Sequence, residues 1–111
     1  INAYMTQQTL WLIDATALPQ VQSEQLYLSH LYIHDMDIGD RIAVKHMQLD
    51  ASMQIESYGI IQAKRADSIC VTWDRHFKAK KWHAYVHYGQ IWKFTGQHWM
   101  DQALINCIVH D

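Results

Sequence analysis

The chain has 111 residues, of which half are hydrophobic and 12% are aromatic, and its formal net charge is −2. This length predicts a single domain with a real core, and the composition excludes a disordered tail. The near-neutral charge argues against a protein that coats DNA through charge alone. No apolar run approaches the ~20 residues that cross a bilayer, and the start does not resemble a signal peptide. We therefore expect residues 1–111 to form one domain and, because the first residue is Ile1, to be part of a longer protein.

The opening segment predicts one strand and one helix. Residues 9–14 (TLWLID) form an apolar run that ends at an aspartate and a turn of small residues, as expected of a first strand. Pro19 suits the first turn of a helix, where its missing N–H costs nothing. Leucines at helical spacing follow, so we expect a helix over about 19–31.

The central segment predicts a meander of three strands. Residues 41–45, 57–62 and 69–73 are short runs rich in β-branched residues, bounded by Gly, Asp or Ser. Alternation places Ile42 and Val44 on one face of the first run. The second run is almost continuously apolar, which predicts a strand covered on both faces, with residues 49–56 as the link before it.

The last third predicts a basic loop, two strands and a helix. We expect the loop at 74–81, a strand at 82–88, a short strand at 91–94 and a closing helix at 97–107. The predicted fold class is α+β, with a curled, barrel-like and mostly antiparallel sheet and flanking helices. Cys70 and Cys107 lie in apolar runs, so we expect buried, reduced thiols and a cytoplasmic protein.

Charge is distributed unevenly along the chain. Residues 1–40 contain no Lys or Arg, whereas 64–93 are rich in both, so one end of the domain could attract a polyanion. The alternative is a solvated loop that happens to be basic. The side chains predicted to contact a nucleic-acid backbone are Lys64, Arg65, Arg75, Lys78, Lys80 and Lys81.

The histidines do not form a recognisable metal motif. His83 and His87 lie ~13 Å apart along a regular strand, too far to share one zinc ion. The two cysteines lack zinc-finger spacing, and there is no HExxH sequence, so surface or half-buried imidazoles are the simpler interpretation. No nucleophile motif or phosphate-binding glycine loop occurs either. We expect no cofactor, no metal and no enzymatic activity in this domain.

Aromatic residues are the remaining signal. Five Trp and six Tyr are many for a small core, although large indoles are often part core and part rim. The functional alternative is a pocket of two or three rings that stacks on a planar group. An extruded nucleobase fits such a pocket, since its faces stack on rings and a few polar groups contact its edge.

The order of these motifs resembles a PUA-like domain, and more narrowly the EVE/YTH-related specificity domains at the front of McrB-type restriction GTPases. The resemblance covers about residues 38–108. It is carried by GDRIAVK (39–45), SYGII (57–61), VTW (71–73), WHAYVH (82–87), QIWKF (90–94) and WMDQALI (99–105), with LWLI (10–13) as the opening strand.

The resemblance implies a DNA-binding specificity domain that takes a modified, methylated base into an aromatic cage and directs a restriction complex. Its expected partners are double-stranded DNA with a modified base and fused or associated GTPase and nuclease subunits. Two alternatives remain open, an RNA-binding PUA-like module and a protein-interaction domain that uses the aromatics as a contact patch. The residues expected to form the base site are Trp11, Asp14, Asp35, Trp73, Tyr85 and Trp92.

Overall fold

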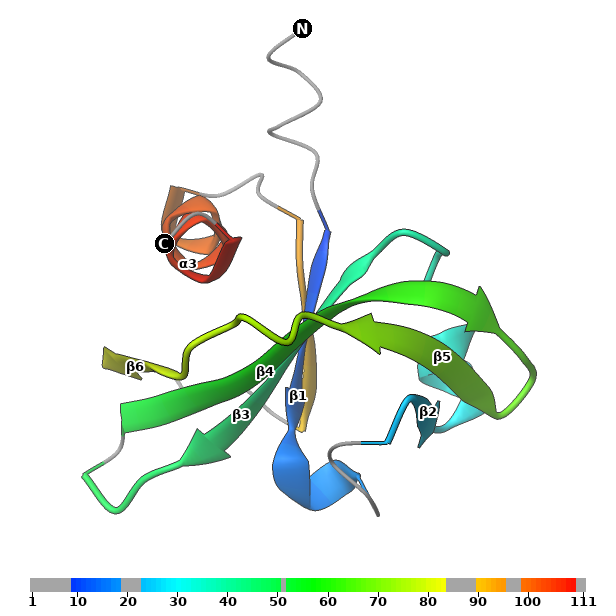
Figure 1. Ribbon diagram of the computed structural model, residues 1–111, viewed down its shortest axis with the longest axis horizontal. Coiled ribbons are helices and arrows are strands. Elements are labelled where there is room, and N and C mark those ends of the chain that lie inside the picture. Colours follow the sequence, from blue (N-terminus) through cyan, green and yellow to red (C-terminus); the bar gives the residue numbers. More distant parts are fainter. Residues whose placement is uncertain (1–8, 19–22, 51, 84–89, 96–98, 110–111) are drawn as a thin grey trace, which may run out of the picture.

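A computed structural model describes residues 9–18, 23–50, 52–83, 90–95 and 99–109 of the chain. These residues form one sheet of seven strands with a few helical segments (Figure 1). Five antiparallel pairings and one parallel pairing, between β1 and β3, hold the sheet together. In chain order the elements are β1 (Leu10–Asp14), the 3₁₀ turn η1 (Ala15–Ala17), β2 (Gln25–Tyr27), α2 (His30–Ile33), β3 (Arg41–Met47), β4 (Ser52–Lys64), β5 (Ser68–Trp73), β6 (Lys80–His83), β7 (Ile91–Phe94) and α3 (Trp99–Val109).

The strand order is β2-β5-β4-β3-β1-β7, and β6 pairs with β4 beside this path. The fold class is therefore α+β with a mostly antiparallel sheet, as the sequence predicts. The path ends at β2 and β7, and the described residues do not pair these two strands, so the sheet is open. No helix among the described residues is long and apolar enough to cross a membrane.

The predicted meander is confirmed as β3, β4 and β5, but β4 is longer than expected. It begins at Ser52 rather than after Glu56, because the β3–β4 turn is tight and residues 53–55 already pair with β3. The Asp50 carboxylate closes this turn by accepting from the Ser52 N–H at 3.1 Å. Such a local bond is the usual reason for Asp in a turn.

The helix predicted over 19–31 is wrong. Residues 19–22 lie outside the described part of the chain, 25–27 form β2, and only His30–Ile33 are helical. Long-range pairing overrides the local pattern here, since Leu26 lies opposite Ile69 in β5 and is buried, whereas Leu31 is 71% exposed.

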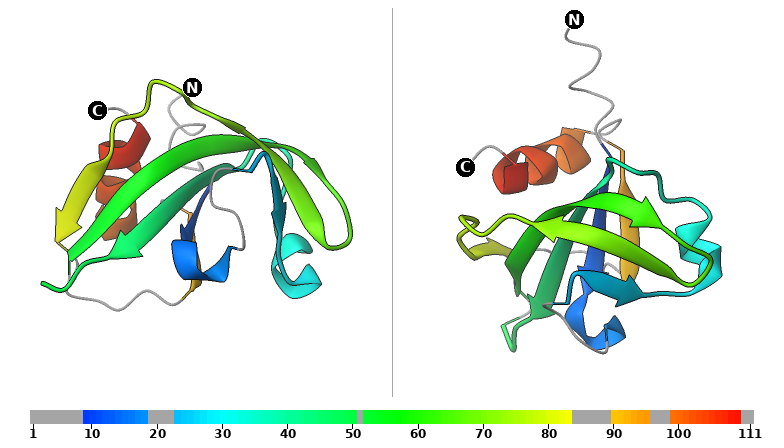
Figure 2. Two further views of the ribbon diagram at one scale, coloured as in Figure 1. Left: turned by 60° about the horizontal axis from the view of Figure 1, so that its bottom comes forward. Right: turned by 45° about the vertical axis from the view of Figure 1, so that its right-hand side comes forward.

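The two faces of the sheet carry separate cores. Ile42 and Val44 contribute to the first core, under η1 and α2, while Ala43 contributes to the second, which α3 covers. This confirms the predicted alternation in β3. The views in Figure 2 place α3 and α2 at opposite ends of the sheet.

The prediction that residues 57–62 are covered on both faces is wrong. Ile61 is buried, but Ile60 is 38% exposed and Gln62 is exposed, so burial alternates along this part of β4. One face of the strand packs on a core and the other meets solvent, which is common in antiparallel sheets. An apolar run alone does not distinguish this arrangement from a fully covered strand.

The C-terminal elements agree with the prediction in kind and differ in their limits. Strand β7 covers residues 91–94 as predicted, and α3 begins at Trp99 and extends to Val109. Strand β6 begins at Lys80, so Lys80 and Lys81 belong to a strand and not to the predicted basic loop. The remainder of the predicted strand at 82–88 lies mostly outside the described residues. Cys70 and Cys107 are free thiols, as predicted, but both are only half-buried.

Candidate functional site

The candidate site lies where the pairing along β4 changes partner. One edge of β4 pairs with β3, and the other edge pairs first with β6 through residues 52–55 and then with β5 through residues 59–64. Residues 56–58 lie between these two pairings. The chain from Asp74 to Ala79 connects β5 to β6 across this interruption, as Figure 1 shows. We call residues 74–79 the bridge segment.

A cleft of about 550 Å³ opens on one side of the bridge segment. We call it the Trp73 cleft, because the half-buried indole of Trp73 is the only ring among the described residues that line it. Charged groups of both signs surround the indole. The cleft is lined by Glu24, Ser57, Thr72, Trp73, Asp74 and Arg75.

Two contacts fix the Trp73 ring in place. Its indole N–H donates to the Ser23 carbonyl at 2.9 Å, so the polar edge of the ring is satisfied by the segment before β2. On β4, Gly59 lies directly opposite Trp73. A Cβ atom at Gly59 would lie 3.0 Å from the indole and 2.6 Å from the Thr72 carbonyl oxygen, so the ring needs this glycine.

A smaller hollow of about 270 Å³ opens on the other side of Asp74, which lines both spaces. We call it the Tyr58 pocket. Its aromatic wall consists of Tyr58 and Phe77, whose ring centroids lie 5.7 Å apart at an interplanar angle of 31°. The last turn of α3 forms the apolar wall. The pocket is lined by Tyr58, Asp74, His76, Phe77, Lys78, Lys80, Ile108 and Val109.

The Tyr58 hydroxyl is oriented by Arg41, whose Nε–H donates to the phenol oxygen at 2.6 Å. Burial raises the pKa of Tyr58, and the Asp74 carboxylate adds to this, while Arg41 acts in the opposite direction. The phenol therefore stays protonated near neutral pH. With its oxygen accepting from Arg41, the hydroxyl keeps one hydrogen for donation to another group.

The six predicted phosphate contacts do not form one surface. Lys64 donates to the Met36 carbonyl at 2.7 Å and, with Arg65, lines a third hollow beside α2. Lys80 donates to the Cys107 and Ile108 carbonyls at the end of α3.

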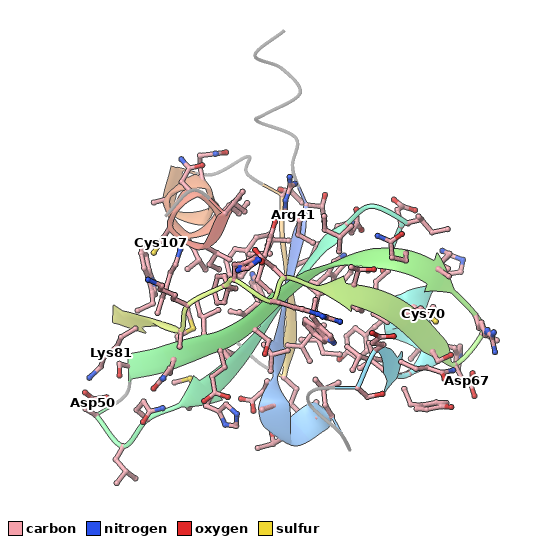
Figure 3. The ribbon with its side chains drawn as sticks, viewed as in Figure 1. Arg41, Asp50, Asp67, Cys70, Lys81 and Cys107 are labelled. Carbon is pink, nitrogen blue, oxygen red and sulfur yellow. The ribbon has the colours of Figure 1, made fainter. Side chains whose placement is uncertain are left out.

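Lys81 also has a partner. It pairs with Asp50 at 2.9 Å, and Figure 3 shows the two side chains directed toward one another. Arg75 and Lys78, in contrast, have no hydrogen-bond or ion-pair partner among the residues that the structure describes. These two exposed cations line the Trp73 cleft and the Tyr58 pocket, respectively, and could meet an anion there. Arg65 is also exposed and has no side-chain partner among the described residues, but it lies away from both spaces, at the third hollow.

The predicted aromatic cage is not assembled around one cavity. Trp11 is 4% exposed in the first core, donates to the Asp40 carboxylate at 3.0 Å and carries Lys93 over its ring at 5.4 Å. Trp92 pairs with Leu12 and so lies on the opposite face of the sheet, where it is 46% exposed. Tyr85 lies outside the described residues, as does His87.

The two predicted acids are also elsewhere. Asp14 binds Lys45 and Thr16, and Asp35 lies beside α2 at the third hollow. The acids that do line the Trp73 cleft are Glu24 and Asp74, which the sequence analysis did not select. Asp74 could have been selected from the sequence, because it directly follows a predicted strand that ends in Trp73. Glu24 had no such signal, because it reaches the cleft only through the pairing of β2 with β5.

The groups at the two spaces suit contacts with a planar, polar ligand. Rings, carboxylates and cations converge on Asp74, but no group of three His, Cys, Asp or Glu side chains that could hold a metal ion occurs within the described ranges. A comparison of the chain with protein-family models, with curated proteins and with solved structures found no match.

Proposed function

We propose that this domain binds nucleic acid and takes one extruded, modified base into the Trp73 cleft. In this proposal the base stacks on Trp73, while Glu24 and Asp74 accept hydrogen bonds from its edge and Arg75 contacts a neighbouring phosphate. The domain itself carries out no reaction. It acts as the specificity part of a cytoplasmic restriction system, and separate GTPase and nuclease subunits act on the methylated DNA that it selects.

The observation that carries the proposal is the composition of the Trp73 cleft. A ring fixed by Ser23 and Gly59 supplies a flat face, and two carboxylates beside it match the amino and ring N–H groups of a base. Stacking of one base on an aromatic side chain contributes about 1–3 kcal/mol. A methyl group adds little polarity, so a close-fitting wall can distinguish it by about 1–3 kcal/mol.

The proposal includes the fold that the resemblance implies, a PUA-like barrel of which the open, seven-strand sheet would be the main part. The base site in this proposal differs from the one that the sequence predicts. The base stacks on Trp73 alone, because Trp11 lies in the first core and Trp92 on the opposite face of the sheet. Of the six predicted phosphate contacts, the proposal keeps Arg75 and Lys78.

The test compares Trp73→Leu with Trp92→Leu, which removes an indole outside the cleft. Fluorescence anisotropy is measured with labelled duplexes of about twelve base pairs that carry 5-methylcytosine, 5-hydroxymethylcytosine, N6-methyladenine or no modification. We expect one modified duplex to bind best, with a loss of about tenfold or more in Trp73→Leu and no loss in Trp92→Leu. Urea unfolding confirms that both variants fold. Equal affinity of wild type and Trp73→Leu, or no binding at low salt to any duplex or single strand, overturns the proposal.

A related measurement shows whether DNA or RNA is the preferred ligand. A competition between single-stranded RNA and the best modified duplex identifies the preferred ligand, since an RNA-binding module prefers the RNA. Preference for RNA would keep the Trp73 cleft as the site and replace DNA as the target.

One observation favours a protein-interaction function as a second candidate. Tyr27, Leu31, Tyr32 and Ile38 are each at least 41% exposed around α2, beside a hollow lined by His30, Ile33 and Lys64. Exposed aromatic and aliphatic side chains of this kind are typical of contact surfaces between proteins. Substitution of Leu31 and Tyr32 by Ser would leave nucleic-acid binding unchanged if the two functions are separate, and anisotropy measures this directly.

A further inference from the structure

We infer that the Tyr58 pocket is a second nucleotide subsite, which holds the base adjacent to the one in the Trp73 cleft. The inference rests on the proposed function. It adds that the domain contacts two successive nucleotides of one unpaired strand.

The first reason is position. The Trp73 cleft and the Tyr58 pocket meet at Asp74, which lines both. Two spaces that both contact the short Asp74 side chain lie next to one another, which is the arrangement that two successive nucleotides of one strand require. Arg75 lines the first space and Lys78 the second, so the cations lie where the linking phosphates would pass.

The second reason is the lining of the pocket. Tyr58 and Phe77 provide the aromatic wall, and Ile108 and Val109 of α3 provide an apolar wall. Its volume of about 270 Å³ is close to the lower limit of small-molecule sites and half that of the Trp73 cleft. Such a space suits a single heterocycle that stacks one of its faces on the Tyr58 and Phe77 rings.

The third reason is the polar edge. The Tyr58 hydroxyl accepts from Arg41 and can donate its own hydrogen, and the Asp74 carboxylate can accept. Every nucleobase presents an acceptor next to an N–H or amino donor on its Watson–Crick edge. Tyr58 and Asp74 could therefore pair with such an edge without selecting one base, which suits a subsite that adds affinity rather than sequence preference.

Lys80 connects two walls of the Tyr58 pocket. Its ammonium group binds the last carbonyls of α3 and lies 5.3 Å from the Phe77 ring centroid, so it joins the helix to the aromatic wall. The ring that would stack on the base is thus fixed before the ligand arrives, which lowers the entropy lost on binding.

The experiment uses single strands of about twelve nucleotides that carry, at the centre, the modification that binds best in the duplex panel. An abasic residue replaces the nucleotide on its 5′ side, on its 3′ side, or on neither side. We expect the abasic residue on one side to weaken binding about tenfold and on the other side to have no effect. In Phe77→Leu the strand with the intact neighbour and the abasic strand are expected to bind equally.

Val109→Trp provides a second variant, because its ring fills the same hollow from the helix side and should also abolish the abasic effect. Ile60→Ala is the control, since this exposed side chain on β4 lines neither space. Binding that is insensitive to abasic residues on both sides overturns this inference and leaves the proposed function intact. An abasic effect that persists in both pocket variants does the same. Absence of binding to all strands and duplexes overturns both.

Discussion

The ammonium group of Lys45 lies 2.9 Å from the Asp14 carboxylate, and the Lys45 side chain is only 1% exposed. The two residues are opposite one another in the parallel pair of β1 and β3. A second pair, Lys81 with Asp50, has the same separation, but both of its side chains are 53% exposed. The two pairs therefore differ in burial and not in distance, which makes them matched tests of how burial changes the value of an ion pair.

Asp14→Asn should destabilise the domain by about 3 kcal/mol, because it leaves the Lys45 charge buried without a counter-ion. Lys45→Met should cost less, since the Asp14 carboxylate is 16% exposed and keeps its bond from Thr16. Asp50→Asn should cost little, because water screens the exposed pair. Urea unfolding measures all three, and equal losses for Asp14→Asn and Asp50→Asn would contradict the assigned role of burial.

The Asp14 pair should also make stability depend on pH. Burial acts to raise the pKa of Asp14, but hydrogen bonds from Thr16 and Lys45 outweigh it and hold the pKa below its ordinary value of 3.8. A carboxyl group with a lowered pKa stabilises the folded chain above its unfolded value, and this contribution is lost as the pH falls through the folded pKa. The stability difference between wild type and Asp14→Asn should therefore be constant near pH 6 and shrink below about pH 4. Unfolding by urea across this range checks it, and a constant difference down to about pH 2.5 would refute it.

Gly59→Ala should lower stability by about 2 kcal/mol and displace Trp73, because the added methyl group would lie 2.6 Å from the Thr72 carbonyl oxygen. The clash is with backbone, so the β4–β5 pairing itself must shift. Urea unfolding gives the loss, and a change in tryptophan emission reports the displaced ring. Gln62→Ala, at an exposed position of the same strand, is the control and should leave the emission unchanged.

Lys80→Met should mainly lower stability, whereas Lys78→Met should mainly weaken the binding of nucleic acid. Lys80→Met removes the bonds to the α3 carbonyls and should cost about 1 kcal/mol of stability. Lys78→Met should change stability by less than about 0.5 kcal/mol, but should weaken binding of nucleic acid and reduce its salt dependence. Urea unfolding and anisotropy at two salt concentrations separate the effects. Loss of stability in both variants, or of binding in neither, would contradict the assignment.

The central strands could be predicted because each is a short β-branched run with a turn residue at its ends. The same information failed at 19–31, where leucines at helical spacing belong to a strand and a one-turn helix. The difference lies in Leu26, which is buried by pairing with a strand more than forty residues away. Local periodicity contains no information about such a partner.

The site was predictable only in part, because local sequence does not show which distant residues meet in the fold. The sequence selected Trp73, Arg75 and Lys78, which are close together along the chain and remain close in the fold. It also selected Trp11 and Trp92, since alternation within a strand does not reveal which face will be buried. Lysines 64, 80 and 81 looked available as charges in a basic run, and only the fold shows that carbonyl groups and a carboxylate already occupy them.

The interruption in the pairing along β4 has a consequence for how such a domain can diversify. Residues 75–79 follow the last β4–β5 hydrogen bond, from the Asp74 N–H to the Tyr58 carbonyl, and precede the β4–β6 pairing, so their length and composition can change while the surrounding strands stay in register. Exchange of this short stretch by grafting should therefore give the same scaffold a different ligand preference, with the sheet as a constant frame.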